Sequence, residues 1–564
     1  MVVGVTSTSA AGEESVPLGR RPRRASGKYV AAARPSGLGS MIGGVSAVTP
    51  CFVPASPPVP SRTYSCDKVA IFMTDRARPR PGAPDRDPTA RNNALIAVLV
   101  TSAFVMILNE TILSVALRDL TVELGVTTTT VQWLTSGFLL TMAVVIPMTG
   151  FLLERFTPRH IFLASLSLFS TGTLLSALAP GFGVLLVGRV VQACGTAVMV
   201  PLLMTSVMRL VPPERRGATM GTITIVIAVA PAVGPTIGGA LLSSLGWRWM
   251  FWLVLPLAVI ALTVGAARFH LDSHTRKVPL DVVSVLLSAL GFGGLLYGLA
   301  SIGESGGGTH TLPPWVPVVV GVAALTTFTY RQLRLQRDDR ALLDLRPFTY
   351  RNFVLGVTLA GLLFICLLGV GSIMLPLYLQ TVLGTTTFVS GLAVLPGGLI
   401  LGFLGRPVGA LYDRLGPRPL VLPGAIAMAT ALWLFTTLGP SSPLTFVIGI
   451  HVVFMVGLSL MMTPLMTESL GVLPDHLHSH GSAILSTLQQ VAGALGTAVF
   501  VTVAALGSAP DAVSPDADGL HTAFVAAGCV AIAAVVTALF VRRGAPAESH
   551  GDHAAEELEV DPAH

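Results

Sequence analysis

Long apolar stretches recur through most of the chain, and they constrain its fold more than any other feature. A helix needs about 20 apolar residues to cross the hydrocarbon core of a bilayer. Only 11% of the residues are charged, whereas soluble domains hold about 25%. The sequence therefore predicts an all-α polytopic membrane protein with fourteen transmembrane helices. The stretches are approximately 94–116, 131–152, 160–180, 183–207, 218–243, 249–268, 280–301, 315–331, 353–379, 388–411, 418–438, 444–470, 482–507 and 521–541.

The basic residues alternate from loop to loop. Arg or Lys precede the first stretch and follow the second, fourth, sixth, eighth, tenth and last, while the intervening loops hold only Arg118 and Arg248. Because cytoplasmic loops carry the excess of Lys and Arg, both termini are predicted to be cytoplasmic. The loop after the twelfth stretch, PDHLHSH, breaks this pattern. We expect a solvated loop there, with no metal bound to His476, His478 or His480.

The two ends of the chain differ from the rest in composition. The N-terminal region is basic, rich in Pro, Ala and Arg, and has no periodic apolar face. This composition favours a disordered tail over a nucleic-acid or lipid-binding arm. We expect translation to start at Met73, or at Met41. The expected organisation is a tail (1–92), an N-terminal six-helix half (93–270), an inserted two-helix pair with its linkers (271–345), a C-terminal six-helix half (346–543) and an acidic disordered tail (544–564).

Short loops leave no room for a soluble catalytic domain. The chain also lacks the GxxxxGK[ST] pattern with which P-loop proteins bind ATP. An enzyme or an ATP-driven pump is therefore not expected, and neither is a cofactor.

A ten-residue pattern occurs twice. Residues 150–159 read GFLLERFTPR and residues 409–418 read GALYDRLGPR. Each follows the second stretch of a set of six, which makes the seventh and eighth stretches an inserted pair. Two similar halves around a central path are typical of secondary transporters.

These patterns and three others together resemble the major facilitator superfamily, in its fourteen-span drug:proton antiporter branch. The resemblance covers about residues 92–543. The loop motif G-x-L-x-D-R-x-G-R appears as GFLLERFTPR, and the R-x-x-Q-G motif as Arg189 to Gly195. The antiporter motif G-x-x-x-G-P-x-x-G-G appears as Ala230 to Gly239, and the first-span motif as LNETILSVALR. The resemblance implies two six-helix halves, an inserted pair, and transport driven by the proton gradient.

The antiporter motif places Gly234, Pro235, Gly238 and Gly239 inside the fifth stretch. Gly234 and Gly238 are four residues apart and share one helix face, where small residues let a neighbouring helix approach closely. Pro235 removes a backbone hydrogen bond and is expected to bend the helix. The alternative is that the glycines serve packing alone.

Two charged residues lie deep in the N-terminal half. Glu110 and Arg189 are each about 9 Å from the outer end of their stretches at a rise of 1.5 Å per residue, so they could pair. Burial favours a neutral carboxylate and a nearby cation favours a charged one, so we expect Glu110 to carry the proton and Arg189 to tune it. The alternative is a static ion pair. Asn109 occupies the position of the family's Asp, and Glu110 follows it.

Two further groups are expected by position or by resemblance. The first is a cytoplasmic gate that holds the inner side shut; the alternative is a solvated loop. Its members are Gly150, Glu154, Arg155, Arg159, Gly409, Asp413 and Arg414. The second is a substrate cavity; the alternative is packing or inter-helix hydrogen bonding. Its members are Gln192, Met374, Tyr378, Gln380, Gln489 and Gln490.

The expected function is proton-coupled export of lipophilic, often cationic compounds across the bacterial cytoplasmic membrane. The partners are small lipophilic molecules, protons and the lipid bilayer, without nucleic acid, and we expect a monomer to suffice. Export of one endogenous metabolite and an uncoupled facilitator are the alternatives. A facilitator has no need of a titrating group at Glu110.

Overall fold

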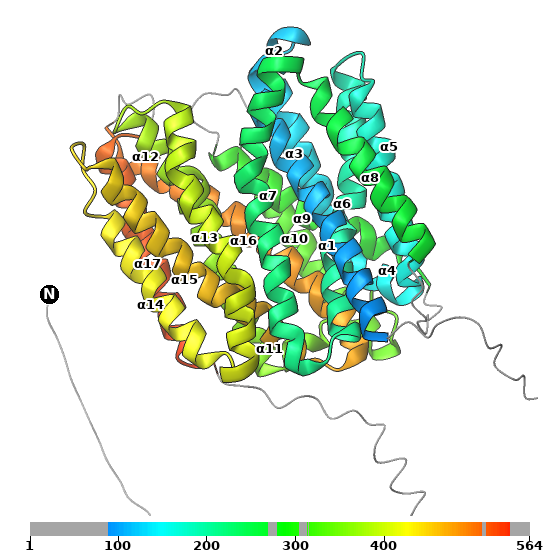
Figure 1. Cartoon of the computed structure of the whole chain (residues 1–564). Helices are drawn as coiled ribbons and strands as arrows, with labels where there is room; N and C mark the ends of the chain where they lie inside the picture. Colours follow the sequence, from blue (N-terminus) through cyan, green and yellow to red (C-terminus); the bar gives the residue numbers. More distant parts are fainter. Residues whose placement is uncertain (1–87, 269–278, 304–312, 314, 510–514, 542–564) are drawn as a thin grey trace, which may run out of the picture. The chain divides into compact units, whose positions relative to one another are not determined.

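The computed structural model describes residues 88–268, 279–303, 313, 315–509 and 515–541 (Figure 1). The expectations for both tails and for the translation start lie outside these residues. Within them, fourteen helical spans are long and apolar enough to cross a membrane. The predicted all-α, fourteen-span fold with two six-helix halves and an inserted pair is confirmed.

The N-terminal half contributes six spans. They are α1 (Pro88–Ile112), α3 (Thr128–Val145) continued by α4 (Thr149–Arg155), α5 (Pro158–Ala177), α6 (Phe182–Leu210), α7 (Arg216–Leu245) and α8 (Arg248–Arg268). A short helix, α2 (Leu117–Glu123), follows α1. The hydroxyls of Thr127 and Thr157 accept backbone N–H bonds at the starts of α3 and α5. Such N-caps satisfy backbone donors that the helix leaves free, which fixes where these helices begin.

The C-terminal half contributes the last six spans. They are α11 (Arg351–Cys366) continued through a π-helical segment (Leu367–Met374) into α12 (Leu375–Thr381), then α13 (Thr387–Leu415), α14 (Arg418–Phe435), α15 (Leu444–Gly471), α16 (His478–Gly507) and α17 (Ala517–Ala538). The hydroxyl of Thr386 caps α13 and the carboxylate of Asp516 caps α17. We call the face of the bundle that carries residues 150–159 and 409–418 the repeat face.

The inserted pair consists of α9 (Val282–Gly303) and α10 (Trp315–Leu335). The two helices approach closely at Gly294 and Gly321, where a Cβ on either would lie against the backbone of the other helix. Helix α9 also packs against α3 of one half and α16 of the other. The indole of Trp133 on α3 stacks on Tyr297 of α9, with ring centroids 5.9 Å apart. The inserted pair therefore contacts both halves.

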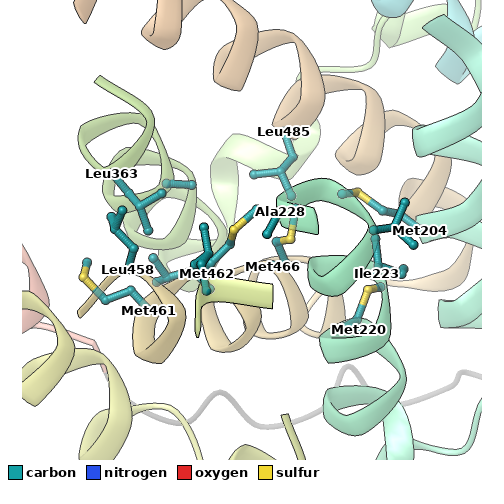
Figure 2. Close-up of a cluster of buried hydrophobic side chains, with 14 of the residues drawn as sticks. Met204, Met220, Ile223, Ala228, Leu363, Leu458, Met461, Met462, Met466 and Leu485 are labelled. Atoms are coloured by element: carbon teal, nitrogen blue, oxygen red, sulfur yellow. The ribbon is translucent and has the colours of Figure 1, made fainter. Parts of the chain in front are cut away.

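The largest buried apolar cluster joins the two halves (Figure 2). Met204 and Met220 come from α6 and α7, and Met462 and Met466 come from α15. All four lie within three turns of the helix ends at the repeat face. Methionine is flexible and polarisable, so it fills irregular gaps and tolerates rearrangement. Near the repeat face, the two halves are therefore in contact through flexible methionine side chains that can rearrange.

Candidate functional site

The first candidate site lies near the end of α1, at Asn109, Glu110 and Thr111. The side chain of Asn109 is 3% exposed, and its Nδ2 has no hydrogen-bond partner among the described residues. Glu110 is half-buried. Consecutive helical residues point about 100° apart, so the amide and the carboxylate face different neighbours. The expected role of Glu110 as the proton carrier stays a prediction.

Two glycines of α7 lie directly against this segment. A Cβ on Gly234 would collide with the hydroxyl of Thr111, and one on Gly238 would lie 2.7 Å from the carbonyl oxygen of Ile112. Close approach of this kind needs small residues spaced four apart. Gly239 has nothing within 4 Å of its Cβ position. The helix that the antiporter glycines contact is therefore α1, next to Glu110.

Arg189 is fully buried on α6 and binds α3. Its Nε donates to the carbonyl oxygen of Leu134 at 3.3 Å, and its guanidinium lies 4.1 Å from the ring centroid of Phe138. Its Nη1 donates to Gln192 at 3.1 Å. In the described part of the chain no ion pair or hydrogen bond joins Arg189 to Glu110. Glu110 and Arg189 were predicted to lie at similar depth and so to be able to pair, but they form no direct ion pair in this conformation.

Gln192 has a structural partner at each end of its amide. The oxygen accepts the Arg189 bond, and Nε2 donates to the hydroxyl of Thr173 on α5 at 2.8 Å. Its side chain is fully buried. Gln192 therefore links α5 to α6, which is the inter-helix alternative, and it has no free polar atom to offer a substrate here.

The candidates on the ninth span are divided by their surroundings. Met374 is fully buried at the end of the π-helical segment. Tyr378 donates its hydroxyl to the carbonyl oxygen of Gly439 at 2.8 Å and packs edge-on against Phe524. Gln380 is exposed. Tyr378 thus links α12 to the loop that follows α14. Its hydroxyl is already hydrogen-bonded and Gln380 is exposed, so neither residue offers a polar atom to a buried cavity.

Helix α16 holds the remaining two candidates, Gln489 and Gln490. Gln489 is 8% exposed, and its Nε2 has no hydrogen-bond partner among the described residues. Gln490 is half-buried. A buried amide with an unused donor is costly unless something binds it. Of the six predicted cavity residues, Gln489 best fits a group that waits for a ligand or water.

At the repeat face, Asp413 joins the two halves. From the end of α13 its Oδ1 accepts the backbone N–H of Gly217 at 2.7 Å, and its Oδ2 accepts that of Ala218 at 2.9 Å. These N–H groups lie in the first turn of α7, where they lack intrahelical partners and carry partial positive charge. Charge-assisted bonds of this kind are stronger than neutral ones. Asp413 therefore clamps the C-terminal half to the N-terminal half.

The same two helices touch through their backbones. Gly217 and Gly221 on α7 face Gly405 and Gly409 on α13, and a Cβ on any of the four would run into the backbone of the opposite helix. Each pair is spaced by four residues, which places both of its glycines on one face. Gly409, predicted from the loop motif, is thus part of a helix crossing without side chains.

Glu154 is the counterpart of Asp413 in the other repeat, and it crosses the interface elsewhere. Its Oε1 lies 3.0 Å from Nε2 of His480, in the first turn of α16. Nδ1 of His480 accepts the backbone N–H of Asp344 at 3.2 Å. Because an N–H can only donate, Nδ1 is unprotonated and Nε2 donates to Glu154. A Cβ on Gly150 would lie 2.5 Å from Nδ1, so only glycine leaves room for the ring.

The histidine loop differs from the prediction. His478 and His480 are 1% and 2% exposed and belong to α16, while His476 is exposed. The expectation of a solvated loop is wrong for the two buried residues. Helix α16 begins four residues before the apolar stretch that was used to define it, and this turns both rings inward.

The basic residues of the repeats take different positions from the acidic ones. Arg159 donates to the carbonyl oxygen of Ala266 at 2.9 Å, near the end of α8 in the same half. Arg155 is exposed, with its guanidinium 5.9 Å from the ring centroid of Phe156. Arg414 is also exposed. Arg159 thus binds within its own half, whereas the carboxylates of both repeats reach across to the other half.

Sequence reasoning missed Glu468 on α15. Its carboxylate is 5% exposed and accepts from Nδ2 of Asn352 at 3.1 Å and from the hydroxyl of Tyr412 at 2.8 Å. Tyr412 immediately precedes Asp413, so this network supports the clamp from within the C-terminal half. The signal was present: Glu468 is a lone carboxylate in the apolar run MMTPLMTESLG.

It also missed His451, which is the eighth residue of α15 as Arg189 is of α6. The segments that begin at these residues read HVVFMVG and RVVQACG, a second internal repeat. His451 is 1% exposed, and neither ring nitrogen has a hydrogen-bond partner among the described residues. A Cβ on Gly397 would lie 2.6 Å from its Nε2. Counted from the ten-residue repeats, Gly397 on α13 corresponds to Phe138 on α3. In each half, therefore, a basic side chain of the fourth span, Arg189 or His451, lies against the same position of the second span.

The chain belongs to the Major Facilitator Superfamily. A profile of that superfamily matches residues 99–497. The chain is therefore a multi-pass transporter of this family.

Several known proteins resemble the chain. It is 42% identical to a lincomycin resistance protein, LmrB, of Bacillus subtilis over 459 residues, which cover 79% of this chain and 95% of the relative. It is 32% identical to a multidrug resistance protein B homolog of Mycobacterium tuberculosis, covering 76% and 80%. The proton:xylose symporter XylE shares the fold with a TM-score of 0.57 at 16% identity, covering 81% of this chain and 97% of XylE.

Proposed function

We propose that this protein is a proton-coupled antiporter that exports lipophilic, often cationic drugs across the cytoplasmic membrane. The observation that carries the proposal is the position of Glu110. It is a half-buried carboxylate inside the first span, beside the contact between α1 and the glycines of α7. Ionisable groups inside membranes are costly and usually functional. A carboxylate at a helix contact that must shift during transport can bind a proton in one conformation and release it in the other.

The substrate class rests on relatives and on charge. Relatives at 42% and 32% identity are named for resistance to lincomycin and to multiple drugs. Inside the first span the Glu110 carboxylate offers a lipophilic cation a group of opposite charge. Export needs no cofactor because the proton gradient supplies the energy, and a single chain contains both halves.

The conformation fits one step of such a cycle. The positive-inside pattern assigns the repeat face to the cytoplasm and both termini with it. The Asp413 and Glu154 contacts then keep the path closed to the cytoplasm. Opening to load a drug requires both contacts to break and the methionine cluster to separate.

The test uses inverted membrane vesicles with an imposed pH gradient. Addition of lincomycin or ethidium should dissipate part of the gradient with wild-type protein and none of it with Glu110→Gln. The matched control is Glu214→Gln, an exposed carboxylate at the repeat face, which should behave as wild type. Coupling retained by Glu110→Gln would assign the proton to another group. No response in wild type to any compound of a broad panel would favour a narrow metabolite exporter or an uncoupled facilitator.

A further inference from the structure

The repeat-face end of the inserted pair is fixed by a polar network that runs from the half-exposed Arg331 to the buried Gln332. Arg331 on α10 donates two hydrogen bonds to Asp281 at the start of α9, at 2.7 and 2.9 Å. These bonds lower the pKa of Asp281 from its ordinary 3.8 to about 2. Ser284 donates to the same carboxylate at 2.5 Å and accepts from Nε2 of Gln332 at 2.7 Å. The two helices therefore form one unit at their repeat-face ends.

Gln332 connects this unit to the segment that follows α10. It is fully buried, and its Oε1 accepts the backbone N–H groups of Leu342 and Leu343 at 2.8 and 3.2 Å. The next backbone N–H, that of Asp344, donates to Nδ1 of His480. We call residues 336–350 the linker. One glutamine thus sets the position of the linker where it meets α16.

The contacts continue across the closure between the halves. His480 holds the linker with one nitrogen and Glu154 of the N-terminal half with the other, at 3.0 Å. Asp344 is 4% exposed, and its carboxylate binds the backbone N–H and Nε of Arg346 at 2.8 and 2.7 Å. An unbroken series of contacts therefore runs from Gln332 through the linker and His480 to Glu154.

We infer that the inserted helix pair stabilises the closed repeat face, and that Gln332 and His480 are positioning residues for this closure. The linker N–H fixes the tautomer of His480, so that Nε2 always offers its proton to Glu154. If the linker moves away, the ring is free to rotate or to change tautomer, and the contact with Glu154 weakens. The two additional spans thereby bias the conformational equilibrium of a transporter whose twelve other spans form the two halves.

The test measures the separation of the halves directly. Spin labels at the exposed His160 and His476, in a chain without native cysteines, flank the Glu154–His480 contact, and double electron–electron resonance gives their distance distribution. Gln332→Ala and His480→Ala should each raise the ratio of long to short distances by about three- to tenfold, the effect of losing one or two hydrogen bonds. The double variant should exceed the larger single effect only slightly, because both residues act in one series.

Matched variants separate positioning from loss of fold. Gln332→Glu keeps the two acceptor contacts with the linker but places an oxygen where Nε2 donates to Ser284, so it should reverse the opening only in part. Thr326→Ala removes an exposed hydroxyl that bonds only to its own helix on α10, and it should change nothing. If Gln332→Ala does not fold, Ser284→Ala weakens the same anchor more mildly.

Two outcomes would overturn the inference. One is a wild-type distance distribution in folded Gln332→Ala or Ser284→Ala protein. The other is opening by Thr326→Ala that equals the opening by Gln332→Ala. The effect of the inserted pair on closure does not depend on the proposed function; only the consequence of that effect for export rests on the proposed transport cycle. If wild-type vesicles show no proton coupling, the proposed function fails while the distance measurement still tests the role of the inserted pair.

Discussion

Removal of the Asp413 carboxylate should release one side of the closure. The carboxylate accepts two backbone N–H bonds from the first turn of α7, at 2.7 and 2.9 Å, and it is half-buried. Loss of a helix N-cap costs about 0.5–2 kcal/mol, and bonds to charged groups contribute about 1.5–3 kcal/mol. Since water partly replaces the lost bonds, we expect Asp413→Ala to cost the closed conformation about 2 kcal/mol. That equals about a thirtyfold rise in the open-to-closed ratio.

A graded series makes this prediction sharper. Asp413→Asn keeps one acceptor oxygen without the charge, so it should cost about 1 kcal/mol, or about fivefold. Spin labels at the exposed Glu214 and Arg418 report the distance between the halves beside this clamp. Asp518→Asn, an exposed acidic residue in the first turn of α17, is the control and should leave the distribution unchanged. Equal distance distributions for wild type, Asp413→Asn and Asp413→Ala would refute the clamp.

Three other substitutions probe separate contacts. Gly405→Val places a side chain where the backbone of Gly221 lies, so it should cost the closed form about 1–3 kcal/mol and increase the open population; an unchanged distribution would mean that the helices do not cross this closely. In Arg189→Lys, an ammonium cannot reproduce the planar hydrogen bonds of the guanidinium or its stacking on Phe138. Thermal unfolding in detergent should therefore show a loss of about 1–3 kcal/mol in the free energy of unfolding, and a wild-type melting temperature would contradict these contacts. Asp281 has a depressed pKa, so its bond to Arg331 is fully present above pH 4 and is lost as the pH falls towards 2. The melting-temperature difference between wild type and Asp281→Asn should therefore be constant from pH 8 to 5 and shrink only below about pH 4; a difference that shrinks between pH 7 and 5 would contradict this.

Much of the fold could be predicted from the sequence because a bilayer permits few solutions. Backbone groups in hydrocarbon must be satisfied within the chain, so a long apolar stretch becomes a helix. The alternation of Arg between loops then supports a count of fourteen such helices. The repeated ten-residue pattern indicated the two halves, and the residues between them became the inserted pair. These inferences depend on local composition and spacing, which a sequence displays directly.

The partners within the site could not be predicted in the same way. Asp413 binds backbone N–H groups, which every residue possesses and no motif reveals. Gln192 was predicted for a substrate cavity, yet Arg189 and Thr173 occupy its amide. His480 was assigned to a loop because the apolar run begins only after it. Such contacts depend on how helices from distant parts of the chain meet. The second repeat, RVVQACG and HVVFMVG, was visible in the sequence and would have indicated His451.

The proposed export depends on Glu110, which should couple it to proton movement. The most direct measurement is drug transport in proteoliposomes, made twice with the same preparations and with a compound that dissipates the pH gradient in inverted vesicles. The first driving force is an imposed pH gradient, and the second is exchange against the same compound preloaded inside, without a gradient. Wild type should perform both, while Glu110→Gln should retain exchange and lose gradient-driven accumulation. Gradient-driven accumulation by Glu110→Gln at the wild-type rate would contradict this expectation.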